Sequence, residues 1–561
     1  MSEPRCISRR EFCRWSLAGS LWTVLGGSAS ATTPLLDAYG GIAGHGAAWS
    51  AAGRRFHTRQ VNGRWLLVTP AGNPYWMLGV FDVDLSGSRF GSSISDSQRA
   101  ISLAKYGSEL VWARQAVRRL RAWGFNCLAE YASEYALPIP LYGRAGNPEQ
   151  MPFMAMIRPA KFSLTNRWSL APGPVKDIVA ATDPKVYRDW RGSATPDVFD
   201  PHFAVYARNE AAALAQHIGH SRWLVGVATD DSDDIYGFGP GPGLPAARLH
   251  PHLGWLVLIS NPVQPSNPAQ GAHYTDPRLH SKYALQDALR QRYGSIERLN
   301  QAWGARYTSF GSDGGWPHGR GLLDESGRGA WLGTGGTRML GASLRLQADL
   351  DAFLYQYAST YFQAVSAALR GSFPDYLVFG PATLNGWNGL TRAPILRAAS
   401  GAVDVVQACA ASDEVLRLTA ASTGNVPLVT WTGLAANADS GLYAYPHAGP
   451  GEPMYDSQAQ RGAAYAAAIA GEFARPAAGR HLVVGSKFWA FADSWPEKMN
   501  WGLVSLRDNA YDGREAVRRL GRDAWGFPTG GEARDFGDSL TPIAGANRSL
   551  YQRLSAELQR Q

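Results

Sequence analysis

Short apolar runs alternate with longer amphipathic stretches along most of this chain, beginning at Tyr75. Short runs bounded by turn residues predict buried strands, and apolar residues at helical spacing predict helices that cover one face of a sheet. Regular alternation of the two predicts a parallel sheet whose strands are joined by crossover helices. We therefore expect an α/β fold, a (β/α)₈ TIM barrel.

The expected strands are Trp76–Phe81, Asn126–Glu130, Trp223–Thr229, Tyr376–Gly380, Val403–Ala408, Pro427–Trp431 and Val483–Phe491. A third strand is expected within residues 136–160, where the apolar signal is poor. The helices expected between the strands include Val111–Trp123, Ala204–His217, Leu279–Tyr293 and Asp349–Leu369.

The sequence predicts two additions to the barrel, a hairpin before it and an insertion within it. Residues 56–70 predict a β-hairpin with Asn62 and Gly63 as a type I′ turn, and we expect it to cap the bottom of the barrel. The stretch 235–345, rich in Gly and Pro, predicts a long insertion after the fourth strand. The expected organisation is a signal peptide at 1–31, a linker at 32–55, one barrel domain at 56–530 and a C-terminal tail or helix at 531–561.

The N-terminal segment resembles an export signal. Arg9 and Arg10 precede a modestly apolar stretch, Trp15–Gly27, which ends in Ala29-Ser30-Ala31. This pattern predicts a twin-arginine signal with a cleavage site, and hence interaction with the twin-arginine translocase and a periplasmic or extracellular location. The apolar stretch is too short for a stable membrane span.

Composition narrows the function classes. The chain has 561 residues, 45 % hydrophobic content and a formal net charge of +8. Its basic residues are scattered, without the basic patch that marks a nucleic-acid-binding protein. The twenty tryptophans exceed what a core needs, and indoles often line sites for amphipathic ligands such as sugars. Cys127 and Cys409 match no metal-ligand spacing and are expected as buried thiols. No cofactor motif is present.

Several motifs, in order, resemble those of β-agarase-type glycoside hydrolases and bacterial β-galactosidases of the (β/α)₈ retaining clan. They include the segments 62–72 (NGRWLLVTPAG), 123–126 (WGFN), 292–304 (RYGSIERLNQAWG), 488–493 (FWAFAD) and 500–504 (NWGLV). The resemblance implies a glycosidase that cleaves O-glycosidic bonds of a poly- or oligosaccharide, and the N-terminal signal predicts that it is exported. No metal or cofactor is implied.

The resemblance also implies two catalytic glutamates, at the ends of the fourth and seventh strands, and neither is in place. A gapless alignment puts Ser232 at the acid/base position and Trp431 at the nucleophile position. Glycoside cleavage needs two facing carboxyl groups, about 5–5.5 Å apart in retaining enzymes and about 6.5–9.5 Å apart in inverting ones.

Other carboxylates could replace the glutamates. Asp231, followed by Asp230, is the preferred acid, because the crowded aspartates after strand four would raise one another's pKa. The same cluster could instead cap a helix or hold a cation. Asp439 and Glu497 are the candidates for the second carboxylate, although a surface ion pair or turn also accounts for each.

Polar and aromatic residues at the expected strand ends suit sugar binding. These are Asp82, Asp84, Glu130, Asn385, Trp387, Trp431, Trp489, Asp493, Asn500 and Trp501. A core or supporting role is the alternative for each one. The leading hypothesis is thus a glycosidase, the second is a carbohydrate-binding protein on a barrel that has lost catalysis, and the third is another enzyme, such as a lyase, on the same scaffold.

Overall fold

The computed structural model of the chain describes residues 34–49, 55–85, 92–132, 150–163, 196–219, 221–230, 280–313, 319–324, 344–381, 393–408, 413–433, 435–436, 454–455, 457–494, 500–514 and 537–560.

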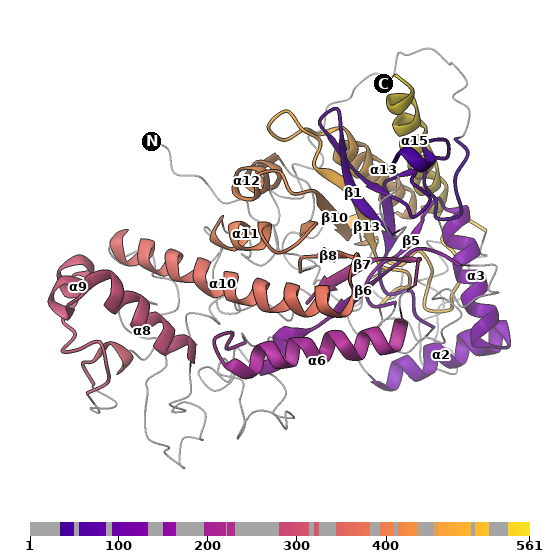
Figure 1. Cartoon of the computed structure of the whole chain (residues 1–561). Coiled ribbons are helices and arrows are strands. Elements are labelled where there is room, and N and C mark those ends of the chain that lie inside the picture. The colour runs from indigo at the N-terminus through magenta and orange to yellow at the C-terminus, as the bar shows by residue number, and fades with distance from the viewer. Residues whose placement is uncertain are drawn as a thin grey trace.

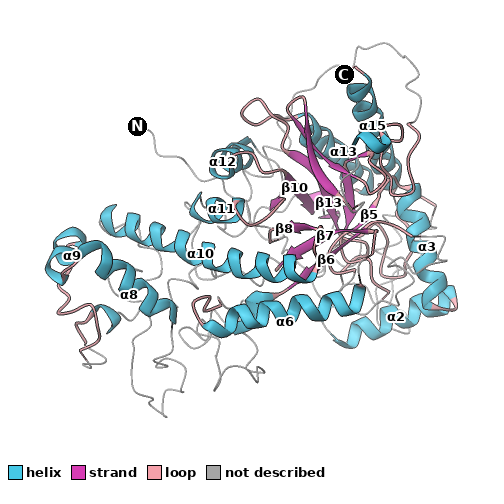
Figure 2. Ribbon diagram, in the orientation of Figure 1, coloured by secondary structure: helices cyan, strands magenta, loops and turns pink. Residues whose placement is uncertain are grey.

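Eight parallel strands form one sheet that closes on itself (Figure 2). In chain order they are β4 (Met77–Val80), β5 (Cys127–Leu128), β6 (Phe153–Ile157), β7 (Leu224–Thr229), β8 (Leu377–Phe379), β9 (Val406–Ala408), β10 (Leu428–Gly433) and β13 (Val483–Trp489). Each strand pairs with the next, β13 pairs with β4, and a parallel bridge between Phe379 and Val405 joins β8 to the start of β9. The fold is therefore a (β/α)₈ TIM barrel, as the alternation of runs predicted.

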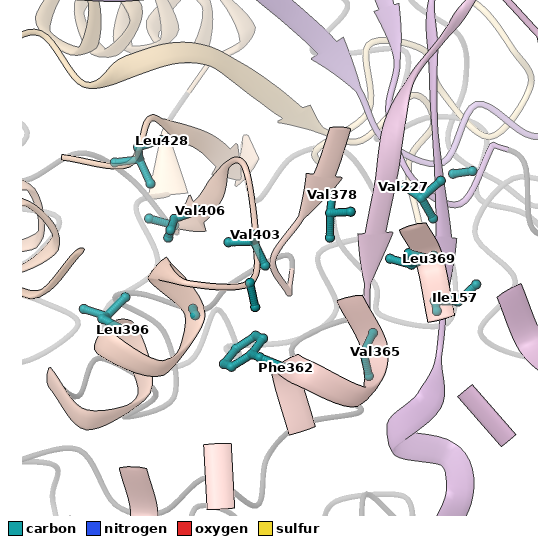
Figure 3. Packing of buried hydrophobic residues seen from close by; sticks show 14 of the residues in the cluster. Ile157, Val227, Phe362, Val365, Leu369, Val378, Leu396, Val403, Val406 and Leu428 are labelled. Atoms are coloured by element: carbon teal, nitrogen blue, oxygen red, sulfur yellow. The ribbon is translucent and has the colours of Figure 1, made fainter. Parts of the chain in front are cut away.

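Side chains on each strand alternate between the barrel interior and the surrounding helices. On β10, Val429 belongs to the interior cluster, whereas Leu428 packs outward. Figure 3 shows the outward layer, in which Val378, Val406 and Leu428 of the strands face helical side chains such as Phe362. Because both faces are buried, these strands are continuous apolar runs, which is why they stand out in the sequence.

Helices surround the barrel and connect its strands (Figure 1). They are α2 (Ser92–Tyr106), α3 (Glu109–Ala122), α6 (Pro201–Ile218), α10 (Leu344–Ser372), α11 (Ala393–Ser400), α12 (Asp413–Thr423), α13 (Gln458–Ala474) and α15 (Leu540–Gln559). Short 3₁₀ helices occur at η1 (Gly46–Trp49), η3 (Pro159–Ser163) and η7 (Leu322–Asp324), and β11 (Ala435–Ala436) pairs with β12 (Met454–Tyr455).

The predicted hairpin caps the amino-terminal end of the barrel. Strands β1 (His57–Val61) and β2 (Arg64–Val68) are antiparallel, and Asn62 and Gly63 between them both have positive φ. Strand β2 also pairs antiparallel with β3 (Pro74–Tyr75). Its Trp65 N–H donates a 2.9 Å hydrogen bond to the carbonyl oxygen of His481, just before β13. The sequence therefore located both the turn and the end of the barrel that the hairpin covers.

The predicted insertion after the fourth barrel strand contains two described helices, α8 (His280–Tyr293) and α9 (Ile296–Trp303), which lie beside α10, away from the sheet (Figure 1). Asp349 of α10 fixes them, because it accepts a 2.8 Å hydrogen bond from the Trp303 indole and lies 3.0 Å from an Arg292 guanidinium nitrogen. No helix in the described ranges is both long and apolar enough to cross a membrane.

The C-terminal helix α15 packs along α13 as part of the helical layer. It includes the end of the segment 537–540 (GDSL), which copies a serine-esterase motif, but here Ser539 is fully buried and accepts a hydrogen bond from Arg461 at 3.2 Å. The boundaries expected at residues 31, 55 and 530 remain predictions.

Candidate carbohydrate site

Five aromatic side chains gather at the carboxyl ends of the barrel strands. Phe81 and Tyr131 follow strands β4 and β5, Trp431 lies within β10, Trp489 ends β13, and Trp501 lies beyond it. We call these five side chains the aromatic platform. Their ring centroids lie between 5.4 and 6.4 Å apart in neighbouring pairs, of which three are edge-to-face and three are tilted. Such spacing is typical of edge-to-face aromatic contacts.

The platform combines buried rings with partly open ones. Phe81 and Tyr131 are buried, whereas the indoles of Trp431, Trp489 and Trp501 are each only partly buried. The carboxyl-terminal face of a (β/α)₈ barrel is where its active sites are built. A cluster of partly open indoles at this face can therefore cover the apolar face of a sugar ring.

The position of Trp501 is fixed by buried hydrogen bonds on both sides of it. Asp493 accepts from Gly502 N–H at 2.8 Å through one oxygen, and from Asn500 Nδ2 at 3.0 Å and the Tyr511 hydroxyl at 2.5 Å through the other. Both Asp493 and Asn500 are fully buried. These two predicted sugar-binding residues therefore hold the loop that carries Trp501.

Arg461 of α13 reinforces the same loop from the helical layer. Its guanidinium donates to Gly502 O at 2.6 Å and to Asn500 O at 3.3 Å, and it lies 5.4 Å from the centre of the Tyr511 ring. Arg461 is fully buried. Because an arginine fork donates several hydrogen bonds in fixed directions, it suits two carbonyls of one tight loop.

Asp230 follows β7 and is also fully buried, with a φ of 51°. Its carboxylate accepts a 3.0 Å hydrogen bond from Ala160 N–H and another from the Tyr361 hydroxyl of α10. The carboxylate thus points into the layer between strands and helices. Its geometry suits an anchor for the end of β7 better than a proton donor to a sugar.

Of the remaining predicted residues, some are buried in the described structure and the others lie outside the described residues. Asp82 and Asp84 are buried after β4, and Asp82 has a φ of 55°, in the left-handed region that few side chains adopt. Glu130, after β5, is fully buried against Lys487. The other predicted positions, Asp231, Asp439, Glu497, Asn385 and Trp387, lie outside the described residues, as do residues 1–33 with the expected signal and Cys409.

Cys127 is a buried free thiol in the barrel interior, and burial raises its pKa. In the parts of the chain that the structure describes, no three His, Cys, Asp or Glu side chains converge as metal ligands.

Comparison with known proteins supports the resemblance that the motifs indicated. No family model matches the chain. Beta-agarase A of Vibrio sp. (strain JT0107) is 24 % identical over 394 residues, which is 62 % of this chain and 33 % of that protein. The chain resembles the β-agarases. It spans about one third of the length of this curated relative.

Solved agarase structures share the fold. The structure of an exo-β-agarase superposes with a TM-score of 0.61 at 18 % identity, covering 93 % of this chain and 67 % of that one. A second agarase superposes with a TM-score of 0.60 at 18 % identity, covering 99 % of this chain and 72 % of that one. The likeness in fold to these agarases thus extends over the whole barrel.

Sequence reasoning missed three residues of this agarase-like barrel that the structure brings to the site. Tyr131 directly follows a predicted strand, Arg461 lies in an amphipathic helix, and Lys487 interrupts the apolar run of the eighth strand. Of the three, only Lys487 could have been noticed in the sequence, because a charged residue in the middle of a buried parallel strand needs a buried partner. The sequence could not show which residue that partner is.

Proposed function

We propose that this protein is a glycosidase that hydrolyses O-glycosidic bonds of a poly- or oligosaccharide, with agarose as the first substrate to test. The observation that supports this most is the aromatic platform at the carboxyl ends of a barrel that resembles the agarases. Export through the twin-arginine pathway, from the sequence of residues 1–31, is part of the same proposal.

For the acid, we propose Asp231. Every predicted carboxylate within the described ranges is buried: Asp82 and Asp84 follow β4, Asp230 and Asp493 are hydrogen-bonded to the protein, and Glu130 is paired with Lys487. A general acid must reach the leaving oxygen, directly or through one water. Asp231, the next residue after the buried Asp230, is therefore the preferred acid, and Asp439 and Glu497 remain the candidates for the second carboxylate.

A second function is favoured by one specific observation. Trp431, which the gapless alignment puts at the position of the family's nucleophile, contributes its ring to the platform, with its centroid 6.2 Å from that of Trp489. An indole cannot attack an anomeric carbon as a carboxylate does. The alternative proposal is therefore a carbohydrate-binding protein that uses the platform without cleavage.

The test compares wild type with Asp231→Asn on agarose, on its oligosaccharides and on aryl glycosides, with the exposed Asp287→Asn as the matched control. Loss of a general acid costs about 10²- to 10⁴-fold in kcat. The loss should be smaller on aryl glycosides whose leaving group needs no proton. Asp439→Asn and Glu497→Gln then test the second carboxylate, whose loss should affect both substrate types equally.

The outcomes separate the two proposals. Equal activity of wild type and Asp231→Asn on agarose would reject the role of Asp231. Binding of agaro-oligosaccharides by wild type without cleavage of any substrate in the panel would reject the glycosidase and support the binding protein.

A further inference from the structure

A buried polar cluster lies in the barrel interior directly beneath the aromatic platform. Lys487 of β13 places its ammonium 2.8 Å from each carboxylate oxygen of Glu130 and within hydrogen-bonding distance of Gln407 Oε1 on β9. Gln407 in turn donates from Nε2 to Gly380 O at 2.6 Å. The Lys487 and Glu130 side chains are 1 % and 0 % exposed, so neither can contact a sugar in this geometry.

These contacts connect strands that are far apart around the barrel. Lys487 belongs to the eighth strand, Glu130 follows the second, Gln407 is in the sixth and Gly380 follows the fifth. Gly79 of the first strand makes room for the lysine, because a Cβ there would lie 3.0 Å from Lys487 Cγ. The interior layers of such barrels are usually filled by branched apolar residues, so an ion pair here is a departure from the rule.

The cluster also contacts the platform itself. The Lys487 ammonium lies 4.5 Å from the centre of the Phe81 ring, on which Trp431 and Trp489 pack at 6.3 and 5.4 Å. An ammonium over an aromatic ring is attracted by the ring's negative face, and the attraction is larger away from water. The lysine therefore fixes the ring on which two partly open indoles rest.

Apolar residues of similar volume often replace a buried ion pair without loss of stability. A precise ligand site, by contrast, needs supporting residues that lock the groups in contact with the ligand. We infer that Lys487, with Glu130 and Gln407, is a positioning residue of the carbohydrate site, which holds the platform through Phe81 in the arrangement that binds sugar. This inference rests on the proposed function, because it takes the platform as the sugar-binding surface.

The test uses Lys487→Met, Glu130→Gln and the paired variant, with Arg290→Met/Asp287→Asn, an exposed ion pair on α8, as the matched control. Melting temperature reports stability, and calorimetric titration with agaro-oligosaccharides reports affinity without requiring turnover. Each single variant should melt at a lower temperature, because it leaves an unpaired buried charge or an unmatched partner. The paired variant should recover most of the melting temperature yet bind at least about tenfold more weakly than wild type.

Recovery of both melting temperature and wild-type affinity in the paired variant would overturn the inference, since the cluster would then be structural only. If the paired variant does not fold, Gln407→Met, which keeps the ion pair, tests instead whether the cluster positions the platform for sugar binding. We expect it to weaken binding severalfold, and wild-type affinity would overturn the inference. If wild type binds the oligosaccharides without cleaving them, and the variants still bind more weakly, only the glycosidase proposal is rejected. If wild type binds none of them, both the glycosidase proposal and the inference about Lys487 are rejected.

Discussion

Glu472 of α13 lies with its carboxyl group against two strands of the barrel, 2.8 Å from the Thr430 hydroxyl of β10 and bonded to Ser486 of β13. It is buried, and the next residues along the strands, Trp431 and Lys487, belong to the platform and the cluster beneath it. Burial raises the pKa of Glu472 to about 7, against the lowering effect of the two hydroxyls and Arg475.

The raised pKa predicts a pH dependence of stability. The folded state holds the Glu472 proton more tightly than the unfolded state, so this group's contribution is complete below about pH 4.5 and is lost as the pH rises through about 7. Glu472→Gln should remove this loss. We expect the variant to exceed wild type by up to ~3 kcal/mol at pH 8 and to match it near pH 4.5.

Chemical denaturation at the two pH values measures the difference, with Glu414→Gln on α12 as the control. Glu414 is exposed and should change little at either pH. A constant difference between Glu472→Gln and wild type from pH 4.5 to 8 would show that the carboxyl does not titrate in this range.

At the scale of elements, the loop of Trp501 is shaped by a glycine that permits close packing. A Cβ on Gly502 would lie 2.2 Å from Asp493 N and 2.3 Å from Val504 O, both backbone atoms that cannot move aside. The loop therefore reaches its position only because residue 502 has no side chain.

Gly502→Ala should displace the loop and weaken agaro-oligosaccharide binding at least about tenfold, with a cost in stability of about 1–3 kcal/mol from overpacking. The control is Gly545→Ala in α15, where a Cβ meets nothing within 4 Å. That change should leave binding intact and stabilise the helix by about 0.5–1 kcal/mol. Unchanged affinity in Gly502→Ala would mean that the loop does not position a ligand-binding group.

Across the whole molecule, the C-terminal helix holds the start of the barrel. The Tyr551 hydroxyl donates to Trp76 O at 2.8 Å and accepts from Asn126 Nδ2 at 2.6 Å, and Asn547 donates to Trp123 O at 2.9 Å. These contacts link α15 to residues before the first and second barrel strands, more than 400 residues away.

Tyr551→Phe removes one hydroxyl from this buried network and should cost about 1–3 kcal/mol of unfolding free energy. Tyr355→Phe on the exposed side of α10 is the control and should change stability by less than about 0.5 kcal/mol. Equal denaturation midpoints for the two variants would show that the hydroxyl adds nothing to the attachment of α15.

The sequence by itself determined the barrel and its order. Seven strands and four helices were predicted within a few residues, because strands buried on both faces must be apolar throughout and helices must be apolar on one. The turn at Asn62 and Gly63 was also predicted directly from the sequence, because few other residue pairs adopt two consecutive positive φ values. Only the third strand, Phe153–Ile157, was poorly marked.

The tertiary structure decided which polar residues face one another. Asp493 and Asn500 are as polar as any sugar ligand, yet their hydrogen bonds to each other and to Gly502 bury them completely. Glu130 meets Lys487 across 357 positions of sequence. The local sequence pattern predicts whether a side chain is buried. The partner whose interaction offsets the cost of burying a charge is decided only when distant strands meet in a closed barrel.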